Sequence, residues 1–98
     1  MAFVQLVDCH TDRLDEMNDL MDKWLERTQG KRTATHSVVG QDRADPHHFV
    51  EIVEFPSYDD ALRNSNLPET HEIYQQMAAL CDEPPRFVDL DVVRDERW

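Results

Sequence analysis

Glycine is scarce in this sequence, with Gly30 and Gly40 the only two among 98 residues. The chain therefore has neither the glycine-rich loops that cradle phosphates nor the Gly-x-Ser-x-Gly turn that exposes a nucleophilic serine. Nucleotide binding of the P-loop or dinucleotide type is disfavoured on this basis. So is serine hydrolysis of the α/β-hydrolase type.

Cysteine and long apolar runs are also scarce. Cys9 and Cys81 fall in separate predicted elements without Cys-x-x-Cys spacing, so we expect two reduced thiols in a cytoplasmic protein. The longest apolar runs are a few residues, too short to cross a membrane. The first residues also lack the basic stretch and apolar core of a signal peptide.

Basic residues are also scarce: the sequence has 10 basic and 21 acidic residues, for a formal net charge of −11. Arg27, Lys31 and Arg32 form the one local basic cluster, at the end of a predicted helix where positive charge is favourable. An acidic surface repels phosphate groups, so nucleic acids and anionic membranes are poor partners.

Two helical regions stand out. Apolar residues at steps of three and four predict an amphipathic helix over residues 14–28, ended by Gly30. Ser57 and Asp60 have capping-box spacing and open a second helix. Residues 64–68 interrupt that helix, and Pro68 suits the first turn of its continuation, which residues 82–85 end.

Four segments have the β-branched and aromatic composition of strands: residues 3–9, 33–40, 48–55 and 87–93. The short loop at residues 41–46 predicts a hairpin between the second and third strands. The resulting order β-α-β-β-α-β is that of a ferredoxin-like α+β fold, with a four-stranded antiparallel sheet and both helices on one face. We expect one domain over residues 1–98.

Several of these strands are apolar on both faces, as residues 3–7 and 49–53 show. A monomer would leave one apolar sheet face in water, which soluble monomers avoid. We therefore expect a homodimer in which two sheets pack face to face. Polar residues on that covered face would need partners or trapped water, and the candidates are Gln5, Thr35, Glu51, Asp89 and Asp91.

Residues 50–62, Asn64 and residues 67–69 resemble the antibiotic-biosynthesis-monooxygenase-like domains of the dimeric α/β-barrel superfamily. In that family a strand ends at an aromatic residue, usually Trp, and an acidic turn, an Ala-Leu helix, a His and a Ser-Pro-His turn follow. Here Phe55 holds the aromatic position, Asn64 holds the His position, and only Pro68 of the last turn matches. The resemblance implies the fold and the dimer. It leaves the reaction open, because members include cofactor-free oxygenases, haem-degrading enzymes and cyclase-like proteins.

Haem degradation is not expected. Similar enzymes use an axial His, a Trp on the third strand and an Asn on the first strand, and Asn64, Phe55 and approximately Gln5 stand at those positions. His71 as a displaced haem ligand is the remaining alternative. No cofactor is predicted.

A pocket is expected between the helices and the sheet, near the interrupted second helix. The predicted catalytic residues are His36, Asn64, His71 and Tyr74. The predicted substrate-pocket residues are Trp24, Tyr58 and Asn66. Each has a structural alternative: a hydrogen-bonded or exposed histidine, a helix-ending asparagine, or a core tryptophan.

No metal site is predicted. His47 and His48 are adjacent, and on a strand they would point to opposite faces, which is poor geometry for chelating one ion. Asp42, Asp45 and His36 lie near them in the sequence and leave such a site as a minor alternative.

Two functions from different classes fit the sequence. The first is a cofactor-independent monooxygenase-like enzyme acting on an aromatic or polyketide-like, enolisable substrate. In it Asn64 or Asn66 would hold a substrate oxygen, and His36, His71 or Tyr74 would take a proton. The second is a non-catalytic dimer that binds a small apolar or aromatic molecule or supports a stress response.

Overall fold

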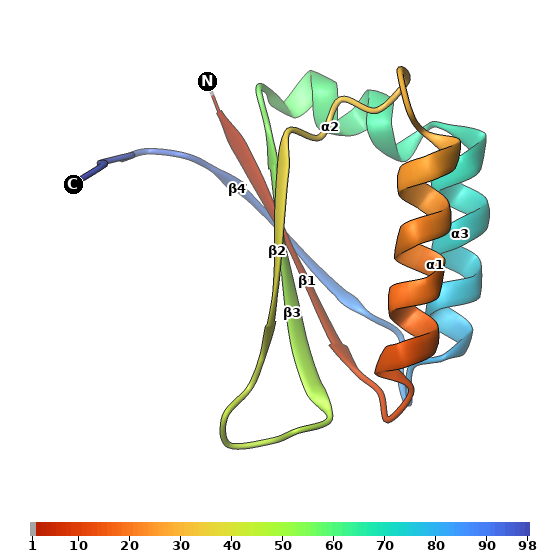
Figure 1. Cartoon of the computed structure of the whole chain (residues 1–98). Coiled ribbons are helices and arrows are strands. Elements are labelled where there is room, and N and C mark those ends of the chain that lie inside the picture. Colours follow the sequence, from red (N-terminus) through yellow and green to blue (C-terminus); the bar gives the residue numbers. More distant parts are fainter. Residues whose placement is uncertain (1) are drawn as a thin grey trace.

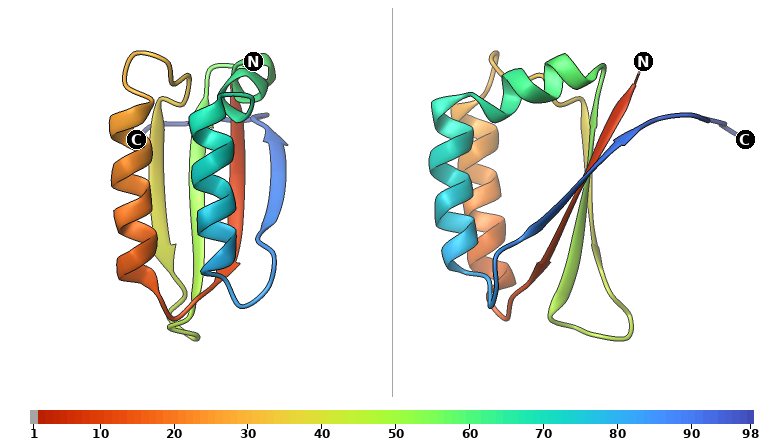
Figure 2. Two further views of the ribbon diagram at one scale, coloured as in Figure 1. Left: turned by 90° about the vertical axis from the view of Figure 1, so that its right-hand side faces the viewer. Right: turned by 180° about the vertical axis from the view of Figure 1, so that it is seen from behind.

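The computed structural model describes residues 2–98. In chain order its elements are β1 (Phe3–His10), α1 (Leu14–Arg27), β2 (His36–Gln41), β3 (His48–Phe55), α2 (Tyr58–Ser65), α3 (Pro68–Ala79) and β4 (Arg86–Asp91). The strands form one antiparallel sheet in the order β2-β3-β1-β4. Helices α1 and α3 lie side by side over one face, and α2 crosses one end (Figure 1, Figure 2). The predicted ferredoxin-like fold is confirmed.

β2 and β4 differ in extent from the prediction. β2 begins at His36. The Thr35 amide still donates to the Glu54 carbonyl of β3 at 2.9 Å, but the Thr33 hydroxyl donates to the Asp60 carbonyl of α2 at 2.6 Å. β4 ends at Asp91, although the Val92 amide still donates to the Ala2 carbonyl at 3.0 Å. Beyond that bond the chain leaves the sheet (Figure 1).

The helix ends follow local chemistry. The Ser57 side chain accepts from the Asp60 amide at 3.1 Å, as its capping spacing predicted. Gly30 has a φ of 79°, the left-handed conformation that favours glycine after a helix. Thr11 does not cap α1 directly; its hydroxyl instead donates to the Leu80 carbonyl at 2.7 Å, which ties the start of α1 to the end of α3.

The two faces of the sheet carry different residue sets. Phe3, Phe49, Val53 and Phe55 are buried toward the helices. The alternate positions form what we call the open sheet face, whose apolar members are Val4, Leu6, Val38, Val50, Ile52, Val88 and Leu90. Val38 is 47% exposed and Leu90 is 42% exposed, so no part of the described chain covers this face.

Four polar strand residues lie on the helix side, which differs from their predicted place on the covered sheet face: Gln5, Glu51, Asp89 and Asp91. Gln5 pairs in register with Asp89, and its amide donates to the Asp89 carboxylate at 3.0 Å. Glu51 shares its side of β3 with Phe49 and Val53. The strict alternation of strand side chains decides the face, and the buried aromatics fix it.

In the described part of the chain, no helix is both long and apolar enough to cross a membrane.

Candidate functional site

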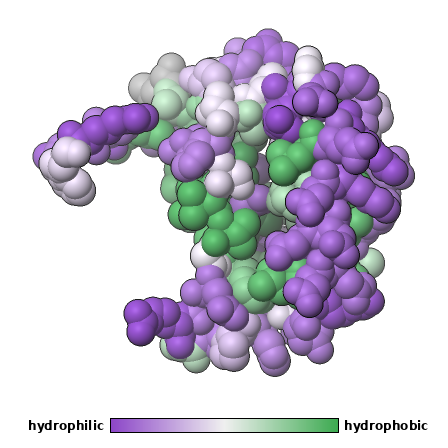
Figure 3. Space-filling view, in the orientation of Figure 1, coloured by the Kyte–Doolittle hydropathy of each residue, from purple (hydrophilic) through white to green (hydrophobic). Residues whose placement is uncertain are grey.

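A cavity of about 550 Å³ separates the sheet from α1 and α3. Apolar surface gathers in the hollow between the sheet and α1 (Figure 3). The volume is within the range of small-molecule sites, roughly 300–1,000 Å³. Val39 and Leu25 line the cavity and are 50% and 43% exposed, so they mark an opening between β2 and α1.

The arrangement of the core explains why the cavity forms. One buried cluster holds Phe3, Val53, Phe55 and Ala61 at one end of the sheet. A second, with Cys9, Met17 and Phe49, packs against the helix ends at the other end. The strand positions between these clusters carry the smaller or polar residues Gln5, Val7, Ser37 and Glu51. The helices are therefore held away from the middle of the sheet.

Glu51 lies on the floor of this cavity. Burial raises the pKa of the Glu51 carboxyl, and the opposing influence is a hydrogen bond from the Ser37 hydroxyl to Oε2 at 3.1 Å. A carboxyl with a raised pKa inside an apolar cavity is a typical feature of general acid–base sites. This group gives the cavity its clearest chemical capacity.

The walls above Glu51 are mainly aromatic and apolar. The Trp24 indole donates to the Thr70 hydroxyl at 2.8 Å, which fixes the ring between α1 and α3. The Arg32 guanidinium lies 5.6 Å from the centre of that ring. Tyr74 and Phe87 pack at 5.3 Å between ring centroids. These surfaces suit a flat apolar ligand.

Asn64 supplies a buried amide to the same cavity. Its side-chain oxygen accepts from the Thr33 amide at 3.4 Å, which assigns the orientation of the carboxamide. The side-chain nitrogen is therefore the group left to donate to a ligand oxygen.

The seven residues predicted from the sequence divide between two locations. Trp24, His36, Asn64 and Tyr74 line the cavity. The lining does not include Tyr58, Asn66 or His71. Tyr58 is half exposed and packs on Phe3, Asn66 is the exposed residue that ends α2, and His71 is exposed beside Gln75.

His36 lines the cavity, but its ring is paired with a carboxylate outside it. Its Nδ1 lies 3.1 Å from the Glu54 carboxylate, and Glu54 is its cross-strand partner on the open side of the sheet. The exposed ring pairs with that carboxylate, so among the described residues Glu51 is the better placed base.

Sequence reasoning missed Glu51 as a functional residue. The available signal was its position between Phe49 and Val53 in a strand of period two, which places a carboxylate on an apolar, helix-facing side.

Comparisons with known proteins fit this geometry. A conserved protein from Methanosarcina mazei Go1 aligns with a TM-score of 0.80 and 13% identity over 92% of this chain and 91% of that one. An antibiotic biosynthesis monooxygenase aligns with a TM-score of 0.74 and 21% identity over 96% and 100%. A cofactor-independent oxygenase from Streptomyces nogalater aligns with a TM-score of 0.78 and 10% identity over 96% and 94%.

Sequence comparison adds nothing further, since no protein-family model and no curated protein matches. Structural likeness at such identities establishes the fold and leaves the reaction to the site itself. The chain has the ferredoxin-like fold of the antibiotic-biosynthesis-monooxygenase-like proteins.

Proposed function

We propose that the protein is a cofactor-independent oxygenase of an enolisable aromatic or polyketide-like molecule, with Glu51 as the general base. The observation that carries this proposal is the Glu51 carboxyl on the floor of an apolar cavity, where burial raises its pKa. Such a carboxylate is a stronger base than one in water, so it can take an acidic C–H proton from a bound substrate.

The remaining side chains fit the same reaction. The Asn64 side-chain nitrogen donates to the enolate oxygen that forms as the proton leaves, and Trp24, Tyr74 and Phe87 hold the flat ring system. The carbanion then reacts with molecular oxygen. For a methylene carbon, one oxygen atom becomes the product carbonyl and the other leaves as water with the two methylene hydrogens.

The experiment uses anthrone, a tricyclic enolisable aromatic, as the probe substrate. The wild-type protein is expected to speed its conversion to anthraquinone with matching oxygen uptake. Glu51→Gln keeps the shape and an acceptor for Ser37, so it should bind anthrone but lose turnover by about 10²–10⁴-fold, the usual contribution of a general base. Glu54→Gln, a carboxylate change on the other face of the same strand, is the control and should keep turnover.

The alternative is a non-catalytic binding protein. It is favoured by the same apolar cavity together with the pairing of the His36 ring with the Glu54 carboxylate, which occupies that histidine outside the reaction. Saturable binding of anthrone without consumption in the wild-type protein would support this alternative and contradict the oxygenase.

We also propose a homodimer formed through the open sheet face. Its support is the row of exposed aliphatic side chains at Val38, Ile52 and Leu90, a surface that soluble monomers rarely leave in water. Two copies of this face related by a two-fold axis would cover each other.

A further inference from the structure

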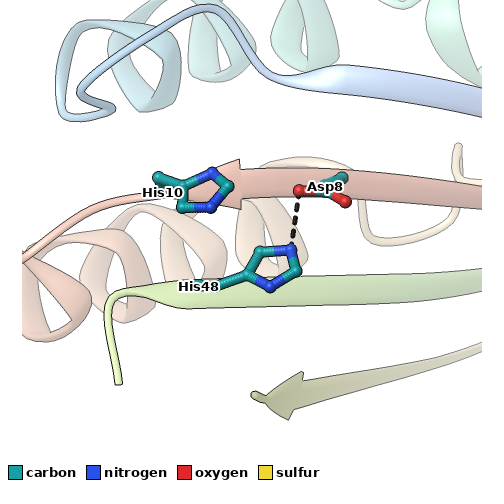
Figure 4. A group of neighbouring side chains, drawn as sticks. All are labelled: Asp8, His10 and His48. Carbon is teal, nitrogen blue, oxygen red and sulfur yellow. Dashed lines mark hydrogen bonds and ion pairs between the residues drawn. The ribbon is translucent and has the colours of Figure 1, made fainter. Parts of the chain in front are cut away.

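A second group of ionisable side chains lies on the other side of the sheet from the cavity. Asp8 and His10 come from β1 and His48 from β3, and one ligand atom from each lies within 4.8 Å of the others (Figure 4). His10 and His48 are direct register partners, and Asp8 is two residues along the same face. The sheet therefore brings the three together, whereas the minor alternative left by the sequence was a site at His47 and His48 with Asp42, Asp45 and His36.

Both ring nitrogens of His48 contact carboxylates, the arrangement of a protonated imidazole, and a metal ion would take the place of the proton on Nε2. The His48 Nδ1 lies 2.8 Å from the Asp42 carboxylate, and its Nε2 lies 2.8 Å from Asp8 Oδ1. Asp42 is itself held in the turn before β3, where it accepts from the Ala44 amide at 2.8 Å. A carboxylate that accepts Nδ1–H fixes the tautomer and leaves the Nε2 lone pair for an ion.

The His10 ring would have to turn to supply a second nitrogen to an ion held by His48. The His10 ring stacks on His48 at 4.5 Å with 7° between planes, and parallel rings cannot both point a lone pair at one ion. Its other contacts are long, 3.6 Å to Glu83 and 4.0 Å to Asp45. With a side chain 38% exposed, the His10 ring has both the space and the freedom to turn.

We propose that Asp8, His10 and His48 form a binding site for a divalent transition-metal ion of the zinc type, with water completing the coordination. Two imidazoles and one carboxylate are a donor set that Zn²⁺ accepts, while Mg²⁺ and Ca²⁺ prefer oxygen ligands alone. Asp42, Asp45 and Glu83 add negative charge around the site, and the chain as a whole is strongly acidic. This site is independent of the cavity and of the oxygenase proposal.

The test is equilibrium dialysis of the tag-free, full-length protein against Zn²⁺ at pH 7.5, with circular dichroism to check folding. Wild type should bind one Zn²⁺ per chain. His48→Gln, His10→Gln and Asp8→Asn should each weaken binding at least about tenfold, and Asp42→Asn about 10–100-fold through the lost support of His48. His47→Gln changes the adjacent histidine outside the cluster and should leave affinity unchanged.

Substitution by Co²⁺ separates this site from the two thiols. The visible spectrum should show nitrogen and oxygen ligands, without a thiolate charge-transfer band. Three results would overturn the proposal: no saturable binding by the folded wild type, equal losses in His47→Gln and His48→Gln, or a thiolate band that Cys9→Ser removes.

Discussion

Glu51→Gln should make the folded protein more stable at neutral pH and should remove part of its pH dependence. Burial raises the pKa of Glu51 above its unfolded value near 4.5, so ionising this carboxyl in its apolar setting costs the folded state stability. The glutamine is neutral and still accepts the Ser37 hydrogen bond. Each pKa unit removed corresponds to about 1.4 kcal/mol of unfolding free energy.

The direction of the pH effect follows from proton binding. Between the unfolded and folded pKa values the folded state binds more protons than the unfolded state, so stability falls as pH rises through that window. At pH values well below 4.5 Glu51 is protonated in both states and the difference disappears. Wild type should therefore lose stability from pH 4.5 upward relative to Glu51→Gln, until Glu51 is fully ionised.

Thermal unfolding at pH 4.5, 6 and 8 measures this difference at one fixed protein concentration, because an oligomer's midpoint depends on concentration. A gain of 1 kcal/mol raises Tm by roughly 4–8 °C for a domain of about this size. Glu54→Gln, an exposed carboxylate on the same strand, is the matched control. A Tm difference that is the same at all three pH values, or a lower Tm for Glu51→Gln at pH 8, would refute the reasoning.

Three further outcomes follow from other parts of the molecule. Ile52→Glu places a charge in the middle of the open sheet face and should convert a dimer to a monomer by light scattering; an unchanged mass would argue against that interface. Burial raises the pKa of the Cys9 thiol to about 12, so iodoacetamide at pH 8 should modify it slowly in the folded protein and quickly in urea, as mass spectrometry can show. Ser57→Ala removes the α2 cap and should lower the free energy of unfolding by about 1 kcal/mol in urea titrations. A change near zero would mean that the hydrogen bond from the Asp60 amide to Ser57 does not stabilise the protein.

The secondary structure could be predicted because its signals are local. The periodicity of residues 14–28 and the β-branched and aromatic composition of residues 48–55 are properties of each segment by itself. The start of β2 could not be predicted, because residues 33–35 have strand-like composition and Thr33 nevertheless bonds to α2. The hydrogen bond from Thr33 to α2 can form only once α2 is folded beside it.

The site was harder to predict because it depends on where the helices lie over the sheet. Of the residues predicted for the pocket, those that line the cavity are Trp24, His36, Asn64 and Tyr74. Tyr58 and His71 lie on α2 and α3 but are exposed, and His71 directly follows the cavity-lining residue Thr70. The Asp8–His10–His48 cluster was missed because it joins two strands 40 residues apart in the chain.

The most direct test of the central claim measures proton abstraction from the substrate rather than oxygen uptake. Anthrone in D₂O without oxygen exchanges its methylene hydrogens for deuterium, and NMR measures the rate. We predict that wild-type protein accelerates this exchange, that Glu54→Gln does so equally, and that Glu51→Gln leaves only the rate in buffer. Equal acceleration by Glu51→Gln, or none by the wild type with anthrone bound, would contradict the role of Glu51 as the base.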